Sequence, residues 1–291
     1  MRLQAMRIQT NALLLCGLVI SSYSVASAIE PRSESVTLKL RTRVEAEKGS
    51  GKWEEKQTET ALHPRETAIV ICDMWDKHWC NQATARCDAL AKKMAPLIDA
   101  ARAAGVHIVH CPSDTMAFYK DAPQRKRILA APTVKPPVPL DRGCPLVKDR
   151  EDTLPIDDSD GGCDDEMPSK TYIAWTRQHP AISISEQDVI SDNGQEVFNY
   201  FAQEHVTTIL YMGVHTNMCV LGRSFGIRRM SQAGLNAILV RDLTDTMYNP
   251  KKAPFVPHEQ GTALVIEHVE KFWCPTVDSE QILKAFGPAG K

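Results

Sequence analysis

Apolar and polar residues follow one another along this chain in blocks that predict alternating strands and helices. Residues 67–73 form a continuous apolar run that ends in a carboxylate, which is typical of a strand buried on both faces of a parallel sheet. Residues 83–104 carry apolar side chains on one helical face, and Gly105 stands where that helix would stop. Residues 106–111 predict a second strand. This order of strand, helix and strand predicts a right-handed crossover within a parallel sheet.

The rest of the chain also predicts alternating strands and helices. Before this unit, residues 33–40 alternate like an edge strand, and residues 45–59 are charged and resemble a loop. After it, the pattern predicts a helix over 194–205, a strand over 207–212, a helix over 221–233, a strand over 236–242, a helix over 257–272, and a short strand or turn and a helix within 276–286. The sequence therefore predicts one three-layer α/β/α domain with a Rossmann-like parallel sheet of about six strands.

Residues 112–185 break this pattern. Repeated prolines exclude long helices and strands there, and residues 151–166 are crowded with acids. An insertion of this length beside a sheet edge is typical of a lid or a pocket wall. Calcium prefers clustered carboxylates, but their spacing here is not that of a standard calcium loop, which favours a solvated acidic loop. The carboxylates in question are Asp158, Asp160, Asp164, Asp165 and Glu166.

Two strand ends carry candidate chemistry. Cys219 falls where the strand over 207–212 gives way to a helix, and the first turn of a helix favours thiolate over thiol. Asp73 ends the first buried strand, so both side chains are expected at the carboxyl edge of the sheet, where ligands bind in open α/β folds. An aspartate beside a cysteine can take its proton and return it to a leaving group. The alternatives are a buried cysteine that packs as a small hydrophobe and an aspartate that caps a turn.

Two motifs resemble those of the isochorismatase-like cysteine hydrolases, the group that includes nicotinamidases and N-carbamoyl amide hydrolases. Residues 71–75 stand where that family has its aspartate strand, and residues 213–220 match its G-x-x-T-x-x-C-V signature. The resemblance covers residues 66–112 and 186–285. It implies that Cys219 is the nucleophile and Asp73 the general base, and that the backbone N–H groups of His215 and Cys219 form an oxyanion hole. It also implies a cis peptide bond between Val214 and His215.

The chain departs from this family at the third catalytic residue. The resemblance places a lysine near residues 186–188, where this sequence has Glu-Gln-Asp. Lys77, four residues after Asp73, is the first candidate for a replacement cation, and Lys170 and Arg177 are the others. Each of the three also fits an ordinary surface charge.

The segment after Asp73 predicts a wall of the site. Trp75, His78 and Trp79 would stand at its mouth and suit a planar or amide substrate, with Thr216 from the cysteine motif beside them. Nicotinamidases bind a metal nearby, which brings Asp76 and the histidines His78 and His110 into consideration. The Asp-x-His spacing occurs at a different place here, so no metal is expected.

Composition and charge limit the kinds of binding partner to expect. The 291 residues are 43% hydrophobic, enough for one sizeable core, and the formal net charge of -2 offers nucleic acid or an anionic membrane no electrostatic attraction. A small-molecule substrate is expected. No glycine-rich phosphate loop is present, so no nucleotide cofactor is expected.

The first residues predict export. Arg2 and Arg7 precede an apolar stretch that ends before Ala26-Ser27-Ala28, the pattern of a secretory signal peptide over residues 1–28. The apolar run is too short to span a bilayer, so no membrane attachment is expected after cleavage. The expected organisation is a signal peptide (1–28), an N-terminal extension (29–65) and a hydrolase domain (66–287). A secreted or periplasmic location follows.

Export makes disulfides possible. Cleavage of the signal would remove Cys16 and leave eight of the nine cysteines, so a free Cys219 requires a second unpaired cysteine, for which Cys72 in the buried strand is the natural candidate. The other six could form up to three bridges. Pairing of Cys80 with Cys87, or of Cys144 with Cys163, would close short loops.

The function expected from the sequence is hydrolysis of a C–N bond in a small amide through a Cys219 thioester. The alternative is an exported small-molecule-binding protein that kept the fold but lost or altered catalysis with the missing lysine. Relatives of this fold often form dimers or tetramers, which leaves a homo-oligomer open.

Overall fold

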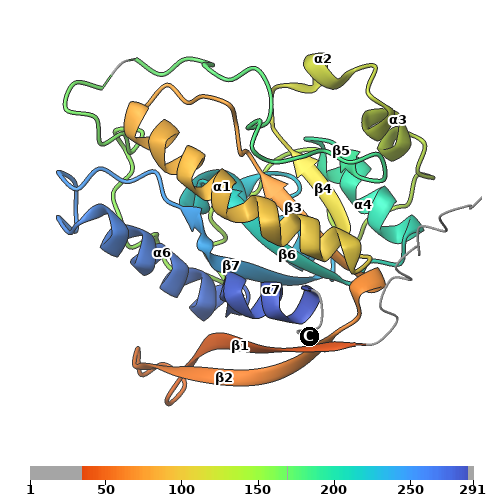
Figure 1. Ribbon diagram of the computed structural model, residues 1–291. Helices are drawn as coiled ribbons and strands as arrows, with labels where there is room; N and C mark the ends of the chain where they lie inside the picture. Colours follow the sequence, from red (N-terminus) through yellow and green to blue (C-terminus); the bar gives the residue numbers. More distant parts are fainter. Residues whose placement is uncertain (1–34, 169, 288–291) are drawn as a thin grey trace, which may run out of the picture. The chain divides into compact units, whose positions relative to one another are not determined.

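An eight-stranded sheet runs through the computed structural model, which describes residues 35–168 and 170–287 (Figure 1). The expected signal peptide lies outside the described residues. The strand order is β2-β1-β8-β7-β6-β3-β4-β5. The strands are β1 (Val36–Glu45), β2 (Trp53–Leu62), β3 (Thr67–Cys72), β4 (His107–Cys111), β5 (Val189–Ile190), β6 (Thr208–Val214), β7 (Asn236–Asp245) and β8 (Thr276–Val277). The six from β8 to β5 are parallel, as predicted, and β1 and β2 add an antiparallel edge.

Helices cover both faces of the sheet and complete the α/β/α layers. They are α1 (Asn81–Ala103), α2 (Met116–Tyr119), α3 (Pro123–Leu129), α4 (Gly194–Gln203), α5 (Ile227–Gln232), α6 (His258–Phe272) and α7 (Ser279–Phe286), with a 3₁₀ turn η1 (Pro64–Glu66) and a π-helical turn η2 (Thr216–Val220). The buried side chains of α1 and α7 share one apolar core, and those of α4, α5 and α6 belong to the other. None of the described helices has the length and apolar character needed to cross a bilayer.

The prediction of a charged loop over 45–59 is wrong for its second part, because residues 53–59 belong to strand β2 and only residues 46–52 form the connecting turn. Every residue of β2 pairs with β1, from Trp53 opposite Glu45 to Leu62 opposite Val36. The strand lies at the edge of the sheet and exposes most of its side chains. Without a buried face it has no apolar alternation to reveal it.

The prediction of one continuous helix over 221–233 is wrong at residues 223–226, which interrupt it. The chain leaves η2, turns at Arg223 and becomes helical again only at Ile227, after Gly226 in extended conformation. A Cβ at Gly226 would lie 2.8 Å from the Val220 carbonyl oxygen, so the tight turn requires glycine. Each apolar residue that suggested the helix is fully buried in the core. The apolar spacing therefore reflects burial of these side chains and not one continuous helix.

Candidate active site

Three adjacent strand ends build the site. Cys72 at the end of β3 pairs with Cys111 of β4 on one side and with Gly213 of β6 on the other. Gly213 has φ +117°, and a Cβ there would lie 2.0 Å from the Cys72 carbonyl oxygen, so only glycine permits this approach. The side chains that follow these strands therefore meet at one carboxyl edge, as the sequence predicted for Asp73 and Cys219.

Asp73 and Cys219 are in direct contact. The Asp73 side chain is fully buried, and its residue has the left-handed φ of +47°. One carboxylate oxygen accepts the backbone N–H of Ser113 at 2.8 Å, and the carboxylate also accepts a hydrogen bond from the Cys219 thiol. Cys219 as a residue is half-buried. The peptide bond between Val214 and His215 is cis, as the resemblance implied.

The cation beside this pair is Arg223. Its Nε lies 3.2 Å from the second carboxylate oxygen of Asp73, its guanidinium also contacts the Cys219 sulfur, and Nη2 lies 3.5 Å from Asp114. The backbone N–H of Arg223 donates to the Cys219 carbonyl at 3.0 Å, so the two residues stand one turn apart. Sequence reasoning missed Arg223. The signal that could have found it was a basic residue four positions after the nucleophile.

The lysine candidates lie elsewhere. Lys77 and Lys170 are exposed, and within residues 35–168 and 170–287 no lysine forms an ion pair with Asp73. Arg177 is exposed as well, with its guanidinium 5.7 Å from the Phe118 ring centre. A catalytic role for Lys77 thus stays an untested prediction, while Arg223 holds the position that it was expected to fill.

The expectation of a resting thiolate is not supported by this environment. Burial raises the pKa of the Cys219 thiol, and the negative charge of Asp73 raises it further, against the lowering effect of Arg223. A helix end contributes only about 0.3–2 kcal/mol, and η2 is a single turn. Burial also raises the pKa of Asp73, opposed by Arg223 and by hydrogen bonds from Cys219 and Ser113. The resting site therefore holds a thiol that donates to a carboxylate.

The turn that carries Cys219 is fixed by buried hydrogen bonds. The Thr216 hydroxyl is fully buried and bonds to the Thr244 hydroxyl at 2.7 Å and to the Asp245 carbonyl at 2.9 Å. The Asn217 amide donates to the Met247 carbonyl at 3.1 Å, and its oxygen accepts the Met247 N–H at 3.0 Å. The hydroxyl of Thr216, which was expected at the substrate, thus holds the turn to β7, and Asn217 holds it to the segment after β7.

An aromatic wall stands beside this turn. Trp75 stacks on Trp175 with ring centres 4.0 Å apart, and His78 lies 5.7 Å from Trp175 and 5.3 Å from Trp79. His215 meets His78 edge to face at 5.1 Å. The three expected wall residues therefore gather near the cysteine turn, and the insertion adds Trp175, which the sequence did not single out.

Both histidines of this wall are neutral at physiological pH. Burial lowers the pKa of His78 to about 4, with a further lowering by the nearby positive charge of Arg86. Burial likewise lowers the pKa of His215 to about 3. The Nε2 atom of His215 and the Nε1 atom of Trp175 are buried without hydrogen-bond partners in the described part of the chain. Buried polar atoms left in this state mark places where a ligand or water can bind.

The residues considered for a metal do not gather. Asp76 accepts hydrogen bonds from Thr176, and the His110 ring bonds to Gln178 and Asp188. Among the described residues, the group close enough to share an ion consists of Cys80, Cys163 and Asp165. Its two sulfurs are joined in a disulfide, so they offer no thiolate ligands.

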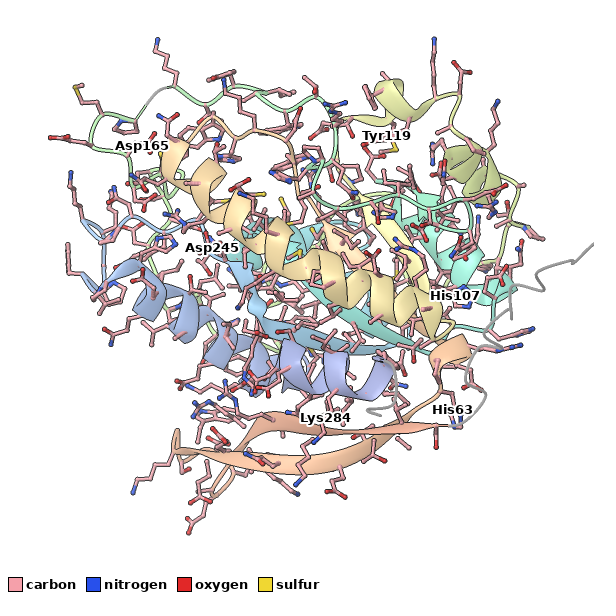
Figure 2. The ribbon with its side chains drawn as sticks, viewed as in Figure 1. His63, His107, Tyr119, Asp165, Asp245 and Lys284 are labelled. Atoms are coloured by element: carbon pink, nitrogen blue, oxygen red, sulfur yellow. A yellow bond between two sulfur atoms is a disulfide. The ribbon has the colours of Figure 1, made fainter. Side chains whose placement is uncertain are left out.

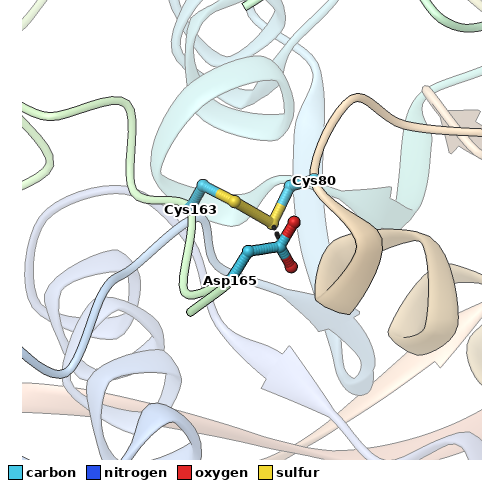
Figure 3. Close-up of side chains that lie close together, drawn as sticks. All are labelled: Cys80, Cys163 and Asp165. Carbon is cyan, nitrogen blue, oxygen red and sulfur yellow. Dashed lines mark hydrogen bonds between the residues drawn. A yellow bond between two sulfur atoms is a disulfide. The ribbon is translucent and has the colours of Figure 1, made fainter. Parts of the chain in front are cut away.

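The Cys80–Cys163 bridge differs from both short-loop pairings expected from the sequence. It ties the start of α1 to the insertion across 83 residues, with Asp165 beside it (Figure 3). Cys87 and Cys144 are buried and free, as is Cys72, the cysteine expected to stay unpaired. The insertion folds back over α1, which brings together two cysteines that are far apart in sequence.

The acidic part of the insertion is solvated only in part, since Asp160 and Glu166 are exposed while Asp158, Asp164 and Asp165 are partly buried. Four of its carboxylates accept hydrogen bonds from other elements or from within the loop. Asp158 bonds to Asn217, Asp160 to Asn249, Asp164 to Arg86, and Asp165 to the backbone N–H groups of Asn81 and Gln82. Figure 2 shows Asp165 and Asp245 on the side of the molecule opposite His63 and His107. Hydrogen bonds of these carboxylates, one of them an ion pair with Arg86, therefore hold the loop against other elements.

Comparison with known proteins adds a fold-level likeness. No family model and no curated protein matches the chain. Solved structures that it resembles include a cysteine hydrolase from Pseudomonas syringae pv. phaseolicola 1448A, at 16% identity over 77% of this chain and 94% of that chain, with a TM-score of 0.47. An isochorismatase-like hydrolase from Alkaliphilus metalliredigens matches at 14% identity over 77% and 98%, with a TM-score of 0.45. An isochorismatase family protein from Burkholderia thailandensis matches at 18% identity over 78% and 98%, with a TM-score of 0.43.

These structures carry the family name that the sequence motifs suggested. Their similarity to this chain is low, so the chemistry has to be read from its own residues.

Proposed function

We propose that this protein is a cysteine hydrolase that cleaves a C–N bond of a small amide. One observation carries the proposal: the Asp73 carboxylate contacts both the Cys219 thiol and the Arg223 guanidinium. A carboxylate with a thiol as donor can accept its proton, and a fixed cation next to both groups stabilises the charge that moves between them.

The first half-reaction forms a thioester. The Cys219 S–H proton passes to Asp73 while sulfur bonds to the amide carbon, and the carbonyl oxygen becomes an oxyanion. The backbone N–H groups of His215 and Cys219 are its proposed donors. Asp73 then gives the proton to the nitrogen, the C–N bond breaks, and ammonia or an amine leaves.

The second half-reaction frees the acid. Asp73 takes a proton from water, the resulting hydroxide attacks the thioester carbon, and the C–S bond breaks to return Cys219 to its thiol form after reprotonation. Because guanidinium keeps its proton throughout, Arg223 does not exchange protons in either half. Contact with Asp73 and Cys219 raises its pKa even above the ordinary arginine value, despite burial.

The wall around the site suits an uncharged substrate group. Trp175 and His215 offer buried polar atoms without partners, and both neighbouring histidines are neutral. A small amide with a planar apolar body would bury against the indoles and place polar atoms at these two positions.

Ammonia release from a library of small amides tests the proposal, with thermal shift recorded in parallel. We expect at least one amide both to stabilise the protein and to release ammonia, and Cys219→Ser to bind that amide without turnover. Stabilisation with no release by the unaltered protein would instead support the binding-protein alternative. Release that survives Cys219→Ser would remove the thioester mechanism.

A further inference from the structure

A segment of the insertion reaches the turn that holds the nucleophile. Residues 157–165, here called the strap, run from the Asp157 contact with Ala253 to the start of α1. Within the strap, a carboxylate oxygen of Asp158 accepts the Asn217 amide at 2.7 Å. Asn217 lies two residues before Cys219 and is buried, with 4% of its surface exposed.

The strap and the segment after β7 share this amide. The Nδ2 of Asn217 donates both to Asp158 and to the Met247 carbonyl, while its oxygen accepts the Met247 N–H. The strap also packs directly on Met247: Gly162 has φ +70°, and a Cβ there would lie 2.3 Å from the Met247 carbonyl oxygen. The strap therefore presses on the same backbone group that orients Asn217.

The far end of the strap is fastened at three points. Cys163 forms the disulfide with Cys80, and Asp164 makes a two-pronged ion pair with Arg86 at 2.7 and 3.0 Å. Asp165, which Figure 3 shows beside the disulfide, accepts the backbone N–H groups of Asn81 and Gln82, the first residues of α1. Cys80, the N-cap residue of α1, makes no side-chain cap of its own, so Asp165 supplies that cap from the insertion.

We infer that Asp158 is a positioning residue that holds Cys219 against Asp73 through Asn217, and that the Cys80–Cys163 bridge keeps the strap in place. This inference rests on the proposed role of Cys219 as nucleophile. Asp158 contacts no reacting atom of that mechanism. It completes the hydrogen bonds of the turn, and a buried amide that loses one acceptor costs enough to loosen its position.

Alkylation of Cys219 by iodoacetamide, followed by mass spectrometry of its peptide, reads this position directly. In the intact site, burial and Asp73 raise the pKa of Cys219, so labelling at pH 8 should be slower than for an ordinary cysteine. In Asp158→Ala, we expect Cys219 to move away from Asp73, its labelling to become about tenfold faster, and its labelling profile to shift to lower pH. Turnover of any amide substrate should fall about tenfold in the same variant.

Two further variants separate positioning from general damage. Asp158→Asn keeps an oxygen acceptor for Asn217 and should restore both the labelling profile and turnover. Asp157→Ala removes a neighbouring strap carboxylate that pairs with Lys252 at 4.0 Å and accepts the Ser159 N–H at 2.9 Å but no hydrogen bond from Asn217, so Cys219 labelling should stay as in the unaltered protein. Cys72 and Cys111, buried in the sheet, should remain unlabelled in every folded variant.

The double variant Cys80→Ser/Cys163→Ser tests the fastening and should speed Cys219 labelling in the same direction. Labelling of Cys72 in Asp158→Ala would show that this variant is unfolded. In that case the double variant decides whether the strap positions Cys219. Unchanged Cys219 labelling and an unchanged pH profile in folded Asp158→Ala would overturn the inference, even if the enzyme is active. Absence of any amide turnover in the unaltered protein would count against the proposed function, while the labelling results would still decide the positioning role.

Discussion

Two buried carboxylates of this protein, Asp73 and Glu151, each lie beside an arginine, but their pKa values are shifted in opposite directions. Both side chains are fully shielded from solvent, and their partners Arg223 and Arg228 lie five residues apart in sequence. Burial raises the pKa of Asp73, and its partners do not overcome that effect. Burial would raise the pKa of Glu151 too, but hydrogen bonds from His268, Arg228, Val147 and Trp273 lower it to about 2.

The difference lies in the donors. Glu151 accepts hydrogen bonds from the His268 ring, the Trp273 indole and the Arg228 guanidinium at 2.8 Å each, and from the Val147 N–H at 2.9 Å. Asp73 receives the backbone N–H of Ser113 and one guanidinium N–H of Arg223, and its other partners are the Ser113 hydroxyl and a thiol that can give up its proton. A carboxylate with a full set of donors is locked in its ionised form. The less satisfied Asp73 keeps the ability to accept and return a proton, which catalysis requires.

The largest expected effect is on turnover, in Asp73→Asn. The amide oxygen can still accept the Ser113 N–H, but the side chain can no longer take the Cys219 proton. We expect kcat to fall by about 10²–10⁴, the usual contribution of a general acid–base group. Thermal unfolding should change little, since the ionised form of a carboxylate with a raised pKa is itself disfavoured by burial. Steady-state kinetics measures the fall in kcat, and calorimetry measures the thermal unfolding. Residual activity above a tenth of the original would show that Asp73 is not the base.

Substitution of the other carboxylate, Glu151, should lower the stability of the fold. Glu151→Ala leaves the buried Arg228 and the donors around it without their acceptor, which should lower the free energy of unfolding by about 3–5 kcal/mol. Urea unfolding at pH 7 measures this loss. Cys219 labelling of the folded fraction should stay unchanged, and a large change there would show that the two carboxylates are coupled.

Acid should weaken the Glu151 region in a defined window. Its folded-state pKa lies below the unfolded value, so its stabilising contribution is complete above about pH 4.5 and is lost as the pH falls toward 2. The shift corresponds to about 3 kcal/mol. The unfolding free energies of the unaltered protein and Glu151→Gln should therefore converge between pH 5 and about pH 2. A constant difference across that range would contradict the lowered pKa.

The smallest effect separates the cation candidates. Arg223→Met removes the charge next to Asp73 and Cys219 and should slow turnover about tenfold to a hundredfold, while it moves the acid limb of the pH–rate profile to higher pH, because Asp73 loses its charge partner. Lys77→Met serves as the control and should leave turnover near normal, since Lys77 is exposed. A tenfold loss in Lys77→Met alone would restore Lys77 as the catalytic cation.

The sequence by itself determined the parallel core and pointed to Asp73 and Cys219, the two residues proposed to react. An apolar run buried on both faces and a strand-to-helix motif with a cysteine are local patterns, and the carboxyl edge of a parallel sheet brings their ends together whatever the loops do. Because sequence patterns are local, two elements were predicted wrongly. Strand β2 has no buried face to produce a pattern, and the break before α5 depends on a tight turn at Gly226 inside an otherwise apolar stretch.

Only the tertiary structure decided the cation, the disulfide and the role of the insertion. Arg223 reaches Asp73 across 150 residues, and Cys80 meets Cys163 because the insertion folds back over α1. The pKa directions of Asp73 and Glu151 depend on how many donors surround each carboxylate in space. Burial and donor count are properties of packing between distant segments, so residue spacing alone does not contain them.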